Sequence, residues 1–236
     1  CARQLPDYHG TEFVKKIDAV YVSVQYRLGV LGWFTHPAFR QDQSRTAEDK
    51  SGNYGTLDLI KALEWVQNNI EAFGGDPGNV TIAGESAGAF NVVSLLMSPL
   101  TEGLFHKAVA RSGGIVTAEI EEGDQLSNNL LAALLRKDGY KGAERSEKRN
   151  TMTDEEIRDY LYDKSGREVL RCFQPAFFGM LPSPTMFKEG TVIPAEGKEV
   201  FKTGAYPSKV PVMIGCNQDE VKLFLAWDRK LVKDEQ

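Results

Sequence analysis

The stretch Gly84–Ala89 holds a serine in the setting that a catalytic nucleophile requires. It reads Gly-Glu-Ser-Ala-Gly-Ala, so one glycine stands two residues before Ser86 and another stands two residues after it. The apolar run Val80–Ala83 precedes this turn and the helix-like run Phe90–Met97 follows it. A strand, a sharp turn and a helix in this order form a nucleophile elbow, in which a strained backbone exposes the serine hydroxyl. A Cβ on either glycine is expected to collide with the neighbouring strand or helix.

A backbone amide and a pair of carboxylates extend this candidate site. Ala87 lies in the first turn of the expected helix, so its N–H points at the same place as the Ser86 hydroxyl and is expected to form half of an oxyanion hole. A serine nucleophile also needs a base and a carboxylate that orients the base. Asp219 and Glu220 follow an apolar run and could supply that carboxylate. Two alternatives stay open from these residues alone: a Gly/Ser-rich turn without chemistry, and a solvated acidic loop.

Four apolar stretches predict the strands of a parallel sheet: Asp18–Tyr26, Val80–Ala83, Leu104–Ala110 and Val210–Cys216. The first is apolar on both faces, so we expect an interior strand. Ser86, Ser112 and the Asp219/Glu220 pair each follow one of the other three strands. Because ligands bind at the carboxyl ends of strands in open α/β sheets, these side chains should lie along one edge.

Helices are expected between and after these strands. Helical spacing of apolar residues predicts a helix over Leu57–Phe73 with Thr56 as its N-cap, which completes a strand-helix-strand unit with the first two strands. Residues 117–170 have the pattern of a helical insertion, in which Thr153–Glu156 forms a capping box. Residues 171–209 contain five prolines and predict a long irregular excursion, of the kind that serves as a functional loop or lid.

Composition excludes several classes of protein. A net charge of -5 and a pI near 5.4 argue against a nucleic-acid or anionic-membrane surface. No apolar run approaches the roughly 18 residues of a transmembrane helix. The three cysteines, Cys1, Cys172 and Cys216, are widely spaced and odd in number, which favours reduced thiols over a disulfide framework or a metal site. A cytoplasmic location is favoured.

Five motifs occur in register along the chain: Tyr26-Arg27-Leu28-Gly29, Asn53-Tyr54-Gly55-Thr56-Leu57-Asp58, Ala62-Leu63-Glu64-Trp65-Val66, Phe73-Gly74-Gly75-Asp76-Pro77 and Gly84-Glu85-Ser86-Ala87-Gly88-Ala89. Together they resemble the type-B carboxylesterases, relatives of the cholinesterases, from about Tyr8 to Glu220. The region Leu95–Gly114 is more similar to bacterial carboxylesterases than to animal cholinesterases.

The resemblance implies a fold and a domain organisation. The expected fold is a partial α/β-hydrolase, with a mostly parallel central sheet, helices on both faces and a helical insertion. Residues 1–236 would form one partial domain: a core with the nucleophile elbow in 1–116, a helical and irregular insertion in 117–209, and a strand with the acid loop in 210–236.

The resemblance also implies roles for individual residues. Ser86 matches the family's nucleophile, and Glu220 rather than Asp219 matches its acid, since the family motif ends Asn-x-Asp-Glu at these positions. Ser112 matches a serine that supports the acid, and Glu85 matches a glutamate that supports the site electrostatically. Ala87 supplies the oxyanion N–H.

Two parts of the family's site have no match in this sequence. The family places its Gly-Gly oxyanion loop upstream of Cys1 and its catalytic histidine downstream of Gln236. Each of the three histidines, His9, His36 and His106, is expected to have a surface or packing role. The sequence is therefore expected to be the middle part of a longer enzyme.

The function that these features imply is a serine hydrolase that cleaves carboxylic esters through an acyl-enzyme, with no metal and no cofactor. Its partner would be a small-molecule ester that the sequence does not specify. The alternative is a non-catalytic, cholinesterase-like binding or adhesion domain. Retention of both Ser86 and Glu220 argues against that alternative. A lipase or a peptidase on the same fold is a further possibility.

Overall fold

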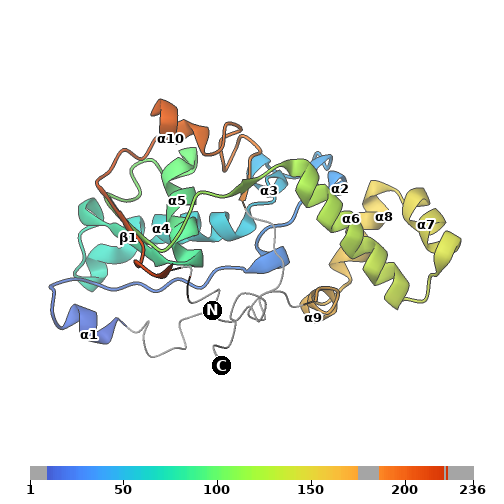
Figure 1. Cartoon of the computed structure of the whole chain (residues 1–236), viewed down its shortest axis with the longest axis horizontal. Helices are drawn as coiled ribbons and strands as arrows, with labels where there is room; N and C mark the ends of the chain where they lie inside the picture. The colour runs from blue at the N-terminus through green and yellow to red at the C-terminus, as the bar shows by residue number, and fades with distance from the viewer. Residues whose placement is uncertain (1–9, 175–185, 221, 223–236) are drawn as a thin grey trace, which may run out of the picture.

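The structure is a computed structural model that describes residues 10–174, 186–220 and 222 (Figure 1). Within these residues three parallel strands form the central sheet in the order β1-β2-β5: β1 (Thr81–Glu85), β2 (Lys107–Arg111) and β5 (Val212–Gly215). Three of the four predicted strands and their parallel arrangement are confirmed.

The other elements surround this sheet. A second pair of parallel strands consists of β3 (Thr117–Ala118) and β4 (Met186–Phe187). Short 3₁₀ helices cover Gly29–Leu31, Ile70–Phe73, Pro77–Asn79 and Pro99–Thr101. The α-helices are α1 (Thr11–Val14), α2 (Pro37–Arg40), α3 (Ala47–Lys50), α4 (Tyr54–Asn69), α5 (Ala87–Met97), α6 (Ile120–Lys137), α7 (Gly142–Thr151), α8 (Asp154–Tyr162), α9 (Gly166–Leu170) and α10 (Glu199–Thr203).

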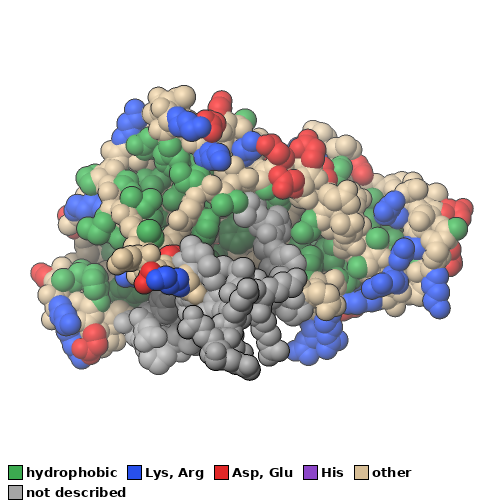
Figure 2. Space-filling view, in the orientation of Figure 1, with side chains coloured by type: hydrophobic (Ala, Val, Ile, Leu, Met, Phe, Trp, Pro, Cys, Tyr) green, Lys and Arg blue, Asp and Glu red, His purple; other side chains and the backbone are tan. Residues whose placement is uncertain are grey.

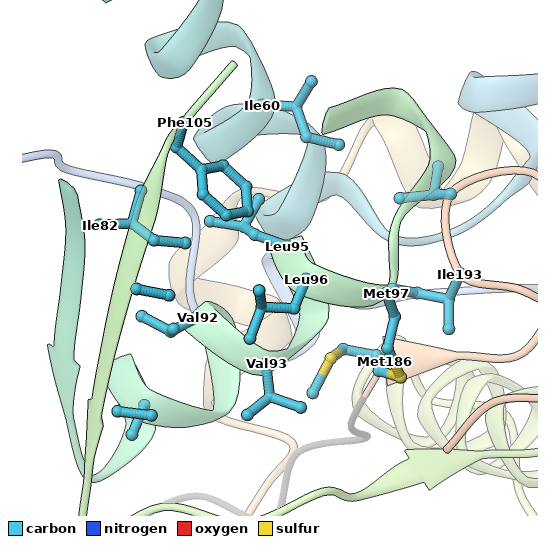
Figure 3. Packing of buried hydrophobic residues seen from close by; sticks show 14 of the residues in the cluster. Ile60, Ile82, Val92, Val93, Leu95, Leu96, Met97, Phe105, Met186 and Ile193 are labelled. Carbon is cyan, nitrogen blue, oxygen red and sulfur yellow. The ribbon is translucent and has the colours of Figure 1, made fainter. Parts of the chain in front are cut away.

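Helix α5 lies at the centre of the hydrophobic core (Figure 3). Every residue from Asn91 to Met97 is buried. Ile82 of β1, Ile60 of α4 and Ile193 of the segment after β4 belong to the same cluster. Since burial of one aliphatic side chain contributes about 1.5–3 kcal/mol, these contacts fix the helix that begins directly after Ser86.

The predicted strand Asp18–Tyr26 is wrong: these residues form no strand in the structure. Several of its apolar side chains are exposed, among them Val20, Tyr21 and Val22 by 40, 44 and 40%. β-Branched and aromatic residues favour a strand when they pack on a covered, pleated surface, and no described strand pairs with this segment. The strand-helix-strand unit that the structure forms is therefore β1-α5-β2.

Helix α4 begins earlier than the sequence predicts. It starts at Tyr54, with Asn53 at the N-cap position, so the predicted cap Thr56 lies inside the helix. Thr56 is fully buried and its Oγ1 accepts a hydrogen bond of 3.3 Å from Trp33 Nε1. Asn53 makes no side-chain cap hydrogen bond, because its side chain bonds Phe187 instead, so the usual cap signal does not mark this start. The α-helix ends at Asn69, before the predicted end at Phe73, and a 3₁₀ turn over Ile70–Phe73 follows it. Gly74 ends that turn, as predicted, with a left-handed φ of 80°.

The insertion forms a helical region that extends away from the sheet (Figure 1). Its predicted capping box is confirmed: Thr153 and Glu156 exchange hydrogen bonds at the start of α8. Helix α7 has no buried residue, and Lys and Arg side chains gather around α7 and α9 (Figure 2). The excursion 171–209 is less irregular than predicted, because β4 and α10 lie within it; its residues 175–185 lie outside the described residues. No helix in the described part of the chain is long and apolar enough to cross a membrane.

Asn53 connects the start of α4 to β4, and its replacement tests this connection. The side chain is fully buried. Its Oδ1 accepts from Phe187 N–H at 2.9 Å, and its Nδ2 donates to Phe187 O at 3.0 Å. Asn53→Ala leaves both backbone groups without a partner, so we expect a loss of about 3 kcal/mol in the free energy of unfolding, measured by chemical denaturation. Asn69→Ala removes one surface hydrogen bond to Trp65 O and should change it by less than about 0.5 kcal/mol. Equal losses in the two variants would contradict this role.

Candidate active site

The predicted site residues meet at the carboxyl edge of the sheet. Ser86 directly follows β1 and its N–H donates to Arg111 O at 2.9 Å. Ser112 directly follows β2 and its N–H donates to Gly215 O at 2.7 Å. The ladder of backbone hydrogen bonds thus continues one residue beyond each strand, and the expected common edge is confirmed.

Ser86 has the backbone conformation of a strained turn. Its φ is 52° and its ψ is -119°, a left-handed φ that a non-glycine residue rarely adopts. The turn is tight, because a Cβ on Gly84 would lie 2.2 Å from the carbonyl oxygen of Gly88. The matching expectation for Gly88 is wrong: a Cβ there meets no described atom within 4 Å. Gly88 lies in the first turn of α5.

Ala87 is the first residue of α5 and is exposed, as is Ser86. A helix leaves the N–H groups of its first turn without partners inside the helix, so they can bind an oxygen atom next to Ser86. Glu85 is the last residue of β1 and is half-buried. The nucleophile candidate therefore sits between the end of a strand and the positive end of a helix dipole.

Glu220 is tied to this edge by three hydrogen bonds to one of its oxygens. Oε2 accepts from Ser112 Oγ at 2.8 Å, from Asn217 N–H at 2.9 Å and from Asn217 Nδ2 at 3.0 Å. The backbone N–H of Asn217, together with the Ser112 hydroxyl, lowers the pKa of Glu220 below its ordinary value. Oε1 accepts no hydrogen bond from the described residues, which leaves it as an acceptor for a further N–H. The neighbouring Asp219 instead pairs with Lys222 at 2.7 Å.

The backbone at Ser112 is strained in the same way as the backbone at Ser86. It also has a left-handed backbone, with φ 53°. A Cβ on the next residue, Gly113, would lie 2.3 Å from the Cβ of Ala89 in the first turn of α5. The loop after β2 therefore packs directly on the helix that follows Ser86. Sequence reasoning missed this contact and the donors of Asn217; the Asn-x-Asp-Glu motif was the signal for the second.

Neither described histidine lies where it could serve Ser86. His106 precedes β2, and its Nδ1 accepts from Val80 N–H at 3.2 Å, at the amino end of the strands. His36 is 4% exposed, and its Nδ1 accepts from Ala38 N–H at 3.1 Å as the N-cap of α2. The predicted packing roles of these two are confirmed; His9 lies outside the described residues. No group of three His, Cys, Asp or Glu side chains within the described ranges could hold a metal ion.

The buried N-cap residue His36 is expected to make the stability of the fold depend on pH. Burial lowers the pKa of His36, against the opposing effect of Asp124 and Asp154. Below about pH 6.5 the unfolded chain therefore takes up a proton before the folded chain does, and stability is lost as the pH falls. His36→Asn keeps a capping acceptor but does not titrate, so its unfolding midpoint should fall less between pH 7.5 and 5.5. Parallel pH profiles of the two proteins would contradict this.

A comparison with known protein families assigns this chain to one of them. A model of the carboxylesterase family matches residues 2–236. The chain belongs to the carboxylesterase family. This membership and the α/β-hydrolase fold confirm what the five motifs predict.

Relatives of this carboxylesterase-family chain come from bacteria and from mammals. Fumonisin B1 esterase of Sphingopyxis macrogoltabida is 33% identical over 97% of this chain and 38% of its own length. Cocaine esterase of Oryctolagus cuniculus is 35% identical over 97% of this chain and 39% of its own length. The crystal structure of the Geobacillus stearothermophilus carboxylesterase EST55 at pH 6.8 superimposes with a TM-score of 0.74 at 33% identity, over 94% of this chain and 43% of that one. The chain thus spans 38–43% of the length of these relatives.

Proposed function

We propose that this chain carries the nucleophile and the acid of a serine hydrolase that cleaves carboxylic esters. The observation that carries the proposal is the strained Ser86 at the same sheet edge as Glu220, whose carboxylate Ser112 and Asn217 hold in place. Family membership supports the reaction class. The names of its relatives refer to quite different esters, so the proposal goes no further than the carboxylic ester.

Each residue has a role in the proposed reaction. A histidine of the same polypeptide, outside the sequence given, takes the proton of Ser86. Oε1 of Glu220 accepts the other N–H of that imidazole and fixes its tautomer. Ser86 Oγ attacks the ester carbonyl, and the N–H of Ala87 stabilises the oxyanion. The alcohol leaves, and water then hydrolyses the acyl-enzyme. Glu85 supports the site electrostatically. Ser112 holds the acid Glu220 in position through its hydrogen bond.

Backbone strain disfavours the alternative of a non-catalytic binding domain. A left-handed backbone at a non-glycine residue costs about 1–3 kcal/mol, and it is usually kept where a function requires it. Here two serines, Ser86 and Ser112, both have it at one edge. A binding domain needs neither a strained hydroxyl nor a carboxylate with one oxygen left to accept an N–H.

Labelling with a fluorophosphonate probe tests the proposed function. The natural polypeptide that carries this sequence should label at Ser86 and hydrolyse p-nitrophenyl butyrate. Ser86→Ala should abolish labelling and lower kcat by about 10⁴-fold or more. Ser44→Ala replaces an exposed serine that lies distant from Ser86 in the sequence. It is the matched control and should label normally. Absence of labelling, or labelling that persists in Ser86→Ala, would support the binding-domain alternative.

A further inference from the structure

Arg111 is the last residue of β2 and lies at the same edge of the sheet as Ser86. Its side chain is exposed, and its backbone oxygen accepts from Ser86 N–H at 2.9 Å. The next residue, Ser112, donates to the carboxylate of Glu220. The backbone of Arg111 therefore contacts the nucleophile on one side and leads directly to the residue that holds the acid on the other.

The register of the sheet places Arg111 between Glu85 and Gly215. Each is a partner of Arg111 in a parallel ladder, so the three positions share one face of the sheet. Neighbouring strands lie about 4.8 Å apart. A Cβ on Gly215 would meet no described atom within 4 Å, so no described side chain fills the position beside Arg111 on the β5 side. Side chains of a strand lean along the strand direction, which at the end of β2 leads toward the carboxyl edge.

The guanidinium of Arg111 forms no ion pair within the described ranges. Glu85 lies beside it in the register, but no ion pair joins the two side chains. The hydrogen bonds to Glu220 come from other residues. Lys222, a second cation at this edge, pairs with Asp219. Arg111 thus presents a fork of N–H donors that no described side chain accepts from.

The chemistry of a guanidinium indicates what this fork would bind. It matches a carboxylate in two parallel, charge-assisted hydrogen bonds. An ester whose carbonyl carbon lies at Ser86 Oγ has its acyl chain about one strand spacing from Arg111. A second carboxylate at the far end of a short acyl chain would therefore lie within reach of this side chain.

We propose that Arg111 is a specificity-determining residue that binds a free carboxylate of the substrate, so that the preferred substrates are half esters of dicarboxylic acids. This inference rests on the ester hydrolysis proposed above and adds the substrate class. The steps at Ser86 stay the same. Only the binding of the far end of the acyl chain depends on Arg111.

Steady-state kinetics with two esters of adipic acid tests this role in the natural polypeptide. The mono-p-nitrophenyl ester carries a free carboxylate, and the methyl p-nitrophenyl diester has the same acyl chain without the charge. Arg111→Gln should lower the ratio of their kcat/KM values, charged over neutral, about tenfold, because the charged ester loses hydrogen bonds to a cation.

Lys107→Gln is the matched control. Lys107 is the first residue of β2 and lies on the same face as Arg111, about 13 Å away at the other end of the strand. Its Nζ donates to Asn79 Oδ1. We expect the ratio of kcat/KM values to change by less than about twofold in this variant.

Two further variants keep the test decisive even if Arg111→Gln does not fold. Arg111→Lys keeps a cation and should retain most of the preference, whereas Arg111→Glu should lower the ratio below the value of Arg111→Gln. An unchanged ratio in Arg111→Gln and Arg111→Glu, or an equal fall in Lys107→Gln, would overturn the proposal. So would an equal loss for both esters, which would assign Arg111 to the fold of this edge. Hydrolysis of the neutral diester with an unchanged ratio refutes the substrate class alone, whereas hydrolysis of neither ester refutes the proposed function as well.

Discussion

Replacement of Glu220 by glutamine is expected to lower kcat for ester hydrolysis by about 10⁴-fold without unfolding the protein. The glutamine side chain keeps the size of glutamate, and its carbonyl oxygen can still accept hydrogen bonds from Ser112 and Asn217. Its NH₂ group would then occupy the position of Oε1 and cannot accept an imidazole N–H. The histidine would lose both its correct tautomer and the charge that stabilises the imidazolium.

Asp219→Asn is the matched control for Glu220→Gln. Asp219 is the adjacent carboxylate, but it pairs with Lys222 at the surface, where such an ion pair contributes little. We expect kcat to change by less than about threefold in this variant. Steady-state kinetics with p-nitrophenyl butyrate compares the two. A large loss in Asp219→Asn with activity retained in Glu220→Gln would assign the acid to Asp219 instead.

The lowered pKa of Glu220 indicates which group sets the pH dependence of kcat. Its hydrogen bonds lower this pKa, so Glu220 is charged at all pH values above the ordinary glutamate range near about 4.3. The stability that these bonds contribute is complete above that range and is lost as the pH falls below it. A loss of activity on acidification near pH 6–7 would therefore report the histidine and not Glu220.

The chemistry-bearing edge could be predicted from the sequence because it depends on local order. Ser86, Ser112 and Glu220 each follow a strand, and parallel strands necessarily bring those ends together. The strand predicted for residues 18–26 is wrong because strand formation depends on a pairing strand and on side chains that cover the sheet. Composition reports neither of these. The two-residue pairing of β3 with β4 is too short to give a periodic signal.

The contact of Arg45 with Tyr162 was also beyond prediction from the sequence. Arg45 donates to Tyr162 Oη across 117 positions. Long-range contacts of this kind leave no spacing pattern, so they become visible only in three dimensions.

The two glycines of the elbow differ in the space around them. Replacing each by alanine therefore distinguishes a steric requirement at Gly84 from helix propensity at Gly88. A Cβ on Gly84 would lie 2.2 Å from the oxygen and 2.3 Å from the carbon of the Gly88 carbonyl, and a backbone atom cannot rotate away. Gly84→Ala is therefore expected to destabilise the fold by about 3 kcal/mol or more, and to lower Tm by about 6–12 °C in thermal unfolding. The displaced turn should also lose fluorophosphonate labelling at Ser86.

Gly88→Ala is the matched control, two residues beyond Ser86. Its Cβ meets no described atom within 4 Å, and the residue lies in a helix without a left-handed φ. Alanine favours a helix over glycine by about 0.5–1 kcal/mol, so this variant should be as stable as the parent protein or slightly more stable. Similar losses in both variants would mean that the turn needs glycine at both positions, as the motif alone suggests. A loss confined to Gly84→Ala would show that the contact with the Gly88 carbonyl sets the strained backbone of the nucleophile.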